Sequence, residues 1–132
     1  MDAHEIADLL RGVRVATQPY SEFLRVPSMS LGIYTLPASG EDPQSPHSED
    51  EVYYVIEGRA RIRVGGEDRE VSPGSLVFVP ARVEHRFHSI REKLSLLVIF
   101  APAEGSQSTA SPPRVRRDRQ RSAQSSRSAR RR

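Results

Sequence analysis

The segment SPHSEDEVYYVIEG, residues 45–58, places one histidine and three acidic residues directly before a run of β-branched and aromatic residues. Residues 52–57 have the composition of a buried strand. Charged side chains at the start of such a strand cost free energy unless they are paired or bind something. We therefore expect a buried strand that begins at a functional site.

Short strands separated by turn residues surround this segment. Gly65 with Gly66 favours a tight hairpin turn, and Pro73 with Gly74 favours a second turn. The expected strands are residues 23–36, with a break or an edge position at Pro27, and residues 52–57, 59–64, 67–71, 75–79, 84–90 and 94–100. Seven or more short strands with no helix between them indicate an all-β, antiparallel sandwich or barrel.

The stretch RARIRV, residues 59–64, alternates strictly between arginine and apolar residues. This period of two predicts a strand with one face in solvent. We interpret Arg59, Arg61 and Arg63 as the solvent face, with a subunit contact as the alternative. The same alternation predicts that Phe87 faces inward and His88 outward.

Residues 1–22 are predicted to form a short helix and a lead-in to the sheet. Asp2 and Glu5 have the spacing of a capping box, and Gly12 follows as a stop. The apolar stripe between them, which we expect to serve packing, consists of Ile6, Leu9 and Leu10.

The composition changes after residue 103. Residues 104–132 carry nine arginines and two acidic residues, a balance of +7, whereas residues 1–103 carry 11 basic and 15 acidic residues, a balance of −4. Val115 is the only large apolar residue of this Arg/Ser-rich tail, so burial cannot offset the entropy of ordering. We expect a disordered tail at 104–132 beyond a barrel at 23–103. One functional hypothesis for the tail is weak nucleic-acid contact through these arginines, although aromatic residues that would stack on bases are absent.

Several classes of protein are disfavoured by composition. The 132 residues suit one domain, and the absence of cysteine excludes a disulfide framework and a thiolate metal site. The acidic N-terminus lacks the features of a signal peptide. The longest apolar run, residues 96–100, is far shorter than the roughly 20 residues that cross a bilayer. We therefore expect a soluble, cytoplasmic protein without a membrane partner.

His47 and Glu51 are the residues of the opening segment that favour metal binding. In a straight strand they would share a face but lie about 13 Å apart, at about 3.3 Å per residue. One ion could not contact both, so the chain must curl through residues 48–50 before the strand begins. His85, which follows the turn at Pro80, is the strong candidate for a third ligand from a distant strand.

Other polar residues near these three have simpler interpretations. A metal-free polar pocket is the alternative to a metal centre. We interpret Glu49 and Asp50 as a solvated turn. Tyr53 shares the parity of Glu51, so its hydroxyl either lines the pocket or fills the core.

Two spaced motifs resemble those of the cupin superfamily, whose small β-barrels fold as a jelly roll. The first is matched by Gly40, His47, Glu51 and Gly58, and the second by Gly74, Pro80 and His85. The resemblance covers about residues 30–101. It implies an antiparallel jelly-roll β-barrel in which His47, Glu51 and His85 bind a divalent transition metal.

Three positions depart from the cupin motifs. Ser45 replaces the first histidine of the family, Arg82 the glycine before the second-motif histidine, and Ser89 the asparagine after it. Two histidines and one carboxylate still suit Fe, Mn, Ni or Zn and leave open coordination positions. Gln44 or Ser45 could add a weak oxygen ligand or hold a bridging water.

The resemblance supports two functions. One is a metal-dependent enzyme of the oxygenase, isomerase or decarboxylase type that acts on an unidentified small molecule. The alternative is a non-catalytic module that binds a sugar or an organic acid. No catalytic residue can be assigned, because only Tyr53 and Gln44 remain as polar pocket candidates beside the ligands. Relatives commonly pair through their N-terminal strands, so we expect a homodimer formed through residues 23–36.

Overall fold

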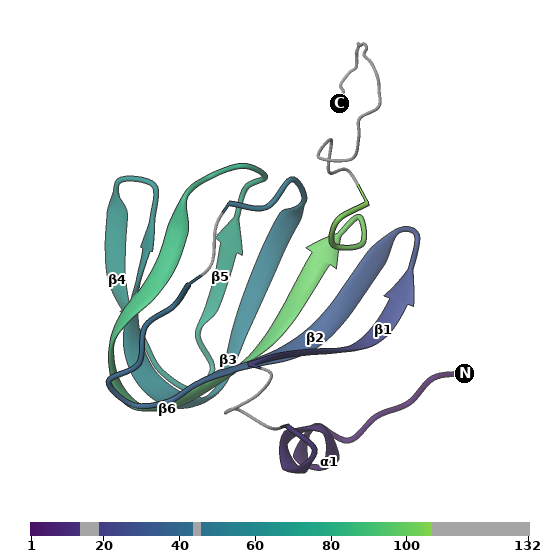
Figure 1. The fold of residues 1–132 in the computed structure, drawn as a ribbon, viewed down its shortest axis with the longest axis horizontal. Coiled ribbons are helices and arrows are strands. Elements are labelled where there is room, and N and C mark those ends of the chain that lie inside the picture. The colour runs from purple at the N-terminus through teal and green to yellow at the C-terminus, as the bar shows by residue number, and fades with distance from the viewer. Residues whose placement is uncertain (14–18, 44–45, 107–132) are drawn as a thin grey trace, which may run out of the picture.

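Six antiparallel strands form one strongly curved sheet that winds into a jelly-roll barrel in this computed structural model, which describes residues 1–13, 19–43 and 46–106 (Figure 1). The sheet order is β1-β2-β6-β3-β4, and β5 pairs with β3. The elements are α1 (Ile6–Arg11), β1 (Tyr20–Val26), β2 (Met29–Leu36), β3 (Asp50–Val64), β4 (Glu67–Val71), β5 (Leu76–Val79) and β6 (His85–Ala101). The predicted all-β, antiparallel jelly-roll fold is confirmed.

Two long strands, β3 and β6, replace four of the short strands that the sequence predicted. β3 has 15 residues and β6 has 17, and the two pair along most of their length. Residues 23–36 divide into β1 and β2 on either side of Pro27, where the break was expected. The predicted turns at Gly65-Gly66 and Pro73-Gly74 are also present. The long strands stay continuous because they bend at irregular positions instead of breaking.

Gly58 is the residue at which β3 bends. Its φ is +99°, and the β3–β6 register shifts on both sides of it, between Val55 and Arg61. A Cβ atom at Gly58 would lie 2.3 Å from the carbonyl oxygen of Lys93. The bend therefore depends on a residue without a side chain, since neither the backbone angle nor the close approach to β6 tolerates one.

The core lies inside the curved sheet and is built from the inward-facing residues of the strands. The largest of these side chains are almost fully buried: Tyr53, Ile62, Phe87, Leu94, Leu96 and Phe100. Phe87 faces inward as predicted, whereas His88 is part-exposed and its Nε2 lies 2.9 Å from Asp68 Oδ2.

The predicted solvent face of residues 59–64 is confirmed, because the side chains of Arg59, Arg61 and Arg63 are 54%, 39% and 58% exposed. Asp68 on β4 accepts a hydrogen bond from Arg61 Nε at 2.9 Å and lies 3.1 Å from Arg63 Nη2. Burial pushes the pKa of Asp68 upward, but Arg61 and His88 more than offset this and hold it below its ordinary value.

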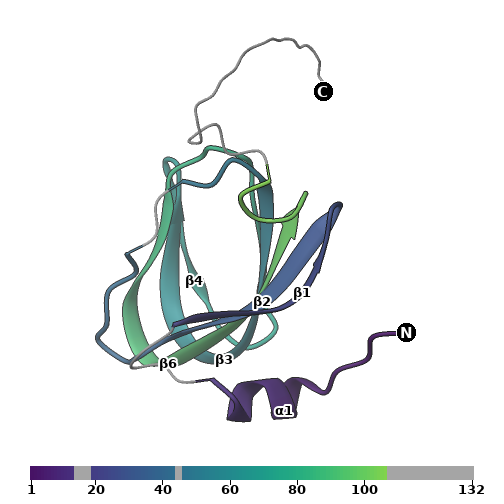
Figure 2. The ribbon, with the colours of Figure 1, turned by 45° about the vertical axis from the view of Figure 1, so that its right-hand side comes forward.

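The N-terminal helix is present but begins later than predicted. Glu5 is its N-cap residue and makes no side-chain capping hydrogen bond, so the expected cap at Asp2 is wrong. The helix ends at Gly12 as predicted. None of its residues is buried, although Leu9 and Leu10 are half-buried. α1 lies at the opposite end of the barrel from the segment that follows β6 (Figure 2).

Some predictions concern features that the structure leaves untested. The disordered tail predicted for residues 104–132 is one, because residues 107–132 lie outside the described residues, whereas Glu104 is hydrogen-bonded to the barrel. The homodimer also stays a prediction, although Val26 and Met29, at the tip of the β1–β2 hairpin, are exposed as a contact through residues 23–36 would require. Among the described residues no helix is long and apolar enough to cross a membrane.

Candidate metal centre

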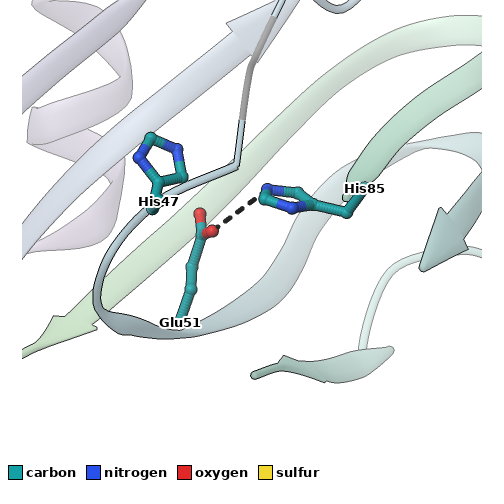
Figure 3. Close-up of side chains that lie close together, drawn as sticks. All are labelled: His47, Glu51 and His85. Atoms are coloured by element: carbon teal, nitrogen blue, oxygen red, sulfur yellow. Dashed lines mark ion pairs between the residues drawn. The ribbon is translucent and has the colours of Figure 1, made fainter. Parts of the chain in front are cut away.

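His47, Glu51 and His85 converge inside one end of the barrel (Figure 3). Each offers a ligand atom, and these three atoms all lie within 4.8 Å of one another. The side chains of Glu51 and His85 are 1% exposed, and that of His47 is 20% exposed. The structure thus brings together the three residues that the sequence singled out.

Barrel closure, and not strand pairing, brings Glu51 to His85. In the β3–β6 ladder Glu51 is opposite Phe100, whereas His85 is opposite Val64 at the far end of β3. Positions 51 and 64 are thirteen residues apart, which would be about 40 Å in a straight strand. Because β3 curls round on itself, Glu51 Oε1 comes to lie 3.2 Å from His85 Nε2.

The loop before β3 is held by the turn before β6. The backbone N–H of Arg82 donates to the carbonyl oxygen of His47 at 2.7 Å, and that of Ala81 donates to Asp50 Oδ1 at 2.9 Å. These two bonds hold the curled segment that the sequence required between His47 and Glu51. They also tie the first motif of the site to the second.

Glu49 corrects one interpretation made from the sequence. Asp50 is exposed, as expected of a solvated turn, but Glu49 is only 2% exposed. Its Oε2 accepts a hydrogen bond from Ser48 Oγ at 2.5 Å. Glu49 is therefore buried, with Ser48 as a hydrogen-bond donor, and is not part of a solvated turn.

The imidazole of His85 is oriented by the backbone. Its Nδ1 lies 2.9 Å from the carbonyl oxygen of Val83, so Nδ1 carries a proton and donates it there. This assignment leaves Nε2 directed at Glu51. Burial lowers the pKa of His85, but the Glu51 carboxylate and the Val83 carbonyl outweigh this effect, so that its pKa is raised.

Three buried polar atoms of the site lack hydrogen bonds within the described part of the chain. They are both carboxylate oxygens of Glu51 and Nε2 of His85. A buried carboxylate without hydrogen-bond donors costs several kcal/mol unless a cation compensates it. These unpartnered lone pairs, with a second imidazole beside them, fit a divalent transition metal held by two nitrogens and one or two oxygens.

Two of the departures from the cupin motifs occupy left-handed backbone positions. Arg82 has φ +66° and Ser89 has φ +52°. Glycine and asparagine adopt such angles at little cost, whereas for other residues the cost is roughly 1–2 kcal/mol. The motif thus specifies backbone geometry at positions 82 and 89. The third departure, Ser45, and the candidate Gln44 lie outside the described residues.

A cavity of about 220 Å³ opens beside His47. It is lined by Pro19, Tyr20, Tyr34, Pro43, His47, Val98, Phe100 and Glu104. Tyr34 donates its hydroxyl proton to the buried Asp42 at 2.6 Å, and Asp42 also accepts the N–H of Phe87 at 2.9 Å. Tyr53 belongs to the core, where its ring packs edge-on to Phe87, 4.8 Å between centroids.

Tyr20, Tyr34 and Glu104 were not predicted as pocket residues. Tyr20 and Tyr34 are ordinary strand residues in the sequence, and Glu104 was assigned to the tail. The ring of Tyr20 lies over Gly32, where a Cβ atom would be 2.4 Å from it. No local pattern marks these residues: Tyr20 and Tyr34 are paired across the β1–β2 hairpin, and Glu104 follows the end of β6.

The barrel and the His-Glu-His group define a cupin-type fold with a site that could hold a metal ion. The chain belongs to the cupin family: its residues 32–100 match the family described as Cupin domain. It is 50% identical over 98 residues to the uncharacterized protein SCO3923 of Streptomyces coelicolor, covering 74% of this chain and 93% of that protein.

Solved structures agree with this fold. TT1209 from Thermus thermophilus superposes with a TM-score of 0.65 at 25% identity, covering 78% of this chain and 99% of that one. BH2720 from Bacillus halodurans superposes with a TM-score of 0.67 at 18% identity, covering 76% of this chain and 80% of that one. The second likeness concerns the fold alone.

Proposed function

We propose that this protein is a metal-dependent cupin enzyme in which His47, Glu51 and His85 bind a divalent transition metal: Fe, Mn, Ni or Zn. The observation that carries the proposal is the buried Glu51 carboxylate, whose two oxygens have no hydrogen bond among the described residues and whose Oε1 lies 3.2 Å from His85 Nε2. A cation bound there offsets the free energy that these desolvated groups cost.

Three protein ligands leave coordination positions for a substrate. The metal, when bound, supplies Lewis-acid or oxygen-activating chemistry of the oxygenase, isomerase or decarboxylase type. The chain orients the ligands through Val83 and Arg82, and its apolar wall at Val98 and Phe100 excludes water from one side of the site.

The cavity beside His47 indicates the size and polarity of the substrate. A cavity of roughly 150 Å³ is large enough for benzene. The cavity here, at about 220 Å³, therefore has room for a small ring compound. Its wall is mainly aromatic and aliphatic, which favours a largely apolar ring compound over a sugar.

The alternative is a non-catalytic module that binds a small ligand. The observation that favours it is the small number of ligands: three side chains converge among the described residues, and serine occupies position 45, where the cupin motif has a histidine. A weaker metal site would be compatible with a structural ion or with none. In that case the apolar cavity alone would bind the ligand.

Metal analysis of the purified full chain tests the proposal. We expect about one equivalent of Fe, Mn, Ni or Zn in the wild type and loss of metal in His47→Ala and Glu51→Gln. His88→Ala is the matched control, because His88 pairs with Asp68 on the outer face. Equal metal content in the wild type and in Glu51→Gln would overturn the proposed site.

Turnover separates the enzyme from the binding module. The metal-loaded protein is incubated with a panel of substituted single-ring compounds, and oxygen uptake and product formation are followed. Turnover that a chelator abolishes supports the enzyme. Binding of a ring compound that a chelator leaves unchanged, without any turnover in the panel, supports the module.

A further inference from the structure

The chain returns to the barrel after its last strand ends. Ala103 is 2% exposed, and its backbone N–H donates to the carbonyl oxygen of Pro27 at 3.4 Å. This returning segment, residues 102–106, lies beside β1 and β2 at the end of the barrel opposite α1 (Figures 1 and 2). It will be called the C-terminal strap.

Glu104 is the residue at which the strap is most firmly attached. Its backbone N–H donates to Ser30 Oγ on β2 at 2.9 Å, and its carbonyl oxygen accepts a hydrogen bond from Arg25 Nη2 on β1 at 2.5 Å. Ser30 is fully buried. Because both backbone polar groups are bound, the direction of the Glu104 side chain is set by the barrel.

The Glu104 carboxylate is directed at the candidate metal centre. Its Oε2 lies 3.7 Å from His47 Nδ1, and the side chain, 33% exposed, lines the cavity beside His47. The separation is longer than a hydrogen bond, so the part-exposed Glu104 side chain would have to move closer to accept one. The second histidine of the site thus has an oxygen acceptor near Nδ1, as His85 has in Val83.

We propose that Glu104 is a positioning residue of the metal centre: its carboxylate accepts the Nδ1 proton of His47 and thereby presents His47 Nε2 to the ion held by Glu51 and His85. A carboxylate on the outer nitrogen fixes the imidazole tautomer, orients the ring and raises its basicity. The inference rests on the proposed function, since it assigns a role at the same metal site.

The position of Glu104 suits a metal site that has serine at position 45 in place of the first histidine of the cupin motif. A second carboxylate near His47 adds negative charge that attracts a divalent cation, although it is not one of the three converging ligands. Partners of this kind typically change metal affinity by about 10–100-fold when they are removed.

Cobalt(II) titration of the full chain tests the inference. We expect Glu104→Gln and Glu104→Ala to weaken Co(II) binding about 10–100-fold and to change the visible ligand-field spectrum, because the ring of His47 is no longer fixed. Glu41→Gln, a change of the same kind on an exposed loop residue, should leave both the affinity and the spectrum unchanged. Ser30→Ala, which loosens the strap, should give an intermediate effect.

A second readout does not need the metal. Nitrogen-15 shifts of the metal-free protein report which ring nitrogen of His47 carries the proton. We expect the Nδ1–H form in the wild type and a mixture of tautomers in Glu104→Ala. Thermal unfolding of the same variants shows whether the barrel remains folded.

The possible outcomes separate this inference from the proposed function. If the wild type binds Co(II), His47→Ala does not, and Glu104→Gln and Glu104→Ala both match the wild type in affinity and spectrum, the role of Glu104 is overturned and the metal centre stands. If the wild type binds no Co(II), the proposed function itself falls, and the inference falls with it. An unchanged His47 tautomer in Glu104→Ala also overturns the role of Glu104.

Discussion

Glu51 Oε1 lies 3.2 Å from His85 Nε2, and neither atom has a hydrogen-bond partner among the described residues. A carboxylate and an imidazole that are both 1% exposed have lost nearly all contact with water. The free energy that this arrangement costs is recovered only when a cation, either a proton or a metal ion, occupies the space between them.

At alkaline pH, where His85 is neutral, replacing Glu51 with glutamine should stabilise the metal-free protein while removing metal binding. The substitution deletes a buried charge and provides an N–H donor for His85 Nε2, and we expect a gain of about 1–3 kcal/mol in the free energy of unfolding. Urea unfolding in the presence of a chelator measures this gain. Addition of metal should raise the melting temperature of the wild type only. A less stable metal-free Glu51→Gln would show that the carboxylate is already compensated.

The metal-free protein should lose stability between neutral and alkaline pH through His85. Its pKa in the folded state is raised above the ordinary value of about 6.5, because Glu51 and the Val83 carbonyl outweigh burial. The stability that His85 contributes is therefore fully present below about pH 6.5 and is lost as the pH rises through the raised pKa. Unfolding free energies of the wild type and His85→Gln, compared from pH 5.5 to 9, isolate this contribution. A constant difference between the two proteins across this range would contradict it.

Substitution of Gly58 with alanine should strongly destabilise the barrel. The added Cβ atom meets the Lys93 carbonyl oxygen at 2.3 Å, and the φ of +99° disfavours any side chain. We expect a loss of more than about 2 kcal/mol. Gly66→Ala is the matched control, because a Cβ there meets nothing within 4 Å, and its effect should stay within about 0.5 kcal/mol. Similar melting temperatures for the two variants would refute the role of Gly58 in the bend.

Two tyrosines of the cavity should respond differently to the loss of their hydroxyl groups. The Tyr34 hydroxyl donates to Asp42, so Tyr34→Phe leaves a buried acceptor with one donor fewer and should cost about 1–3 kcal/mol. The Tyr20 hydroxyl is buried without a partner among the described residues, so Tyr20→Phe should be neutral or stabilising. Chemical denaturation of both variants gives the comparison. Equal losses would show that Tyr20 has a partner after all.

Restoring the cupin residue at position 89 should relieve backbone strain. Ser89 has φ +52°, an angle that asparagine tolerates better than serine. We expect Ser89→Asn to add about 0.5 kcal/mol to the unfolding free energy, whereas Ser89→Val should lose about 1 kcal/mol or more. Arg82→Gly should be close to neutral, because the relief of its φ of +66° is offset by the greater flexibility of glycine in the unfolded chain. A destabilising Ser89→Asn would contradict the strain at this position.

Local patterns in the sequence determined the strands, the turns and the inner and outer faces. Alternation at residues 59–64 predicted the exposed arginines, and Pro27 predicted the break between β1 and β2. These features follow from the side-chain period of a strand, from the fixed φ of proline and from the freedom of glycine to adopt positive φ, all of which act over a few residues. The same local view failed at Glu49, which is buried, and at the helix start, where Glu5 is the N-cap residue and makes no side-chain capping hydrogen bond.

The candidate site divides in the same way between sequence and structure. The spacing of His47, Glu51 and His85 within two motifs was enough to select them, but their meeting depends on the closure of β3, which carries positions about 40 Å apart along the strand to one side of the barrel. Glu104 could not be found at all from the sequence, because it is placed by hydrogen bonds to Arg25 and Ser30, 79 and 74 residues earlier in the chain. Contacts of that range carry no local signature, so only the tertiary structure decides them.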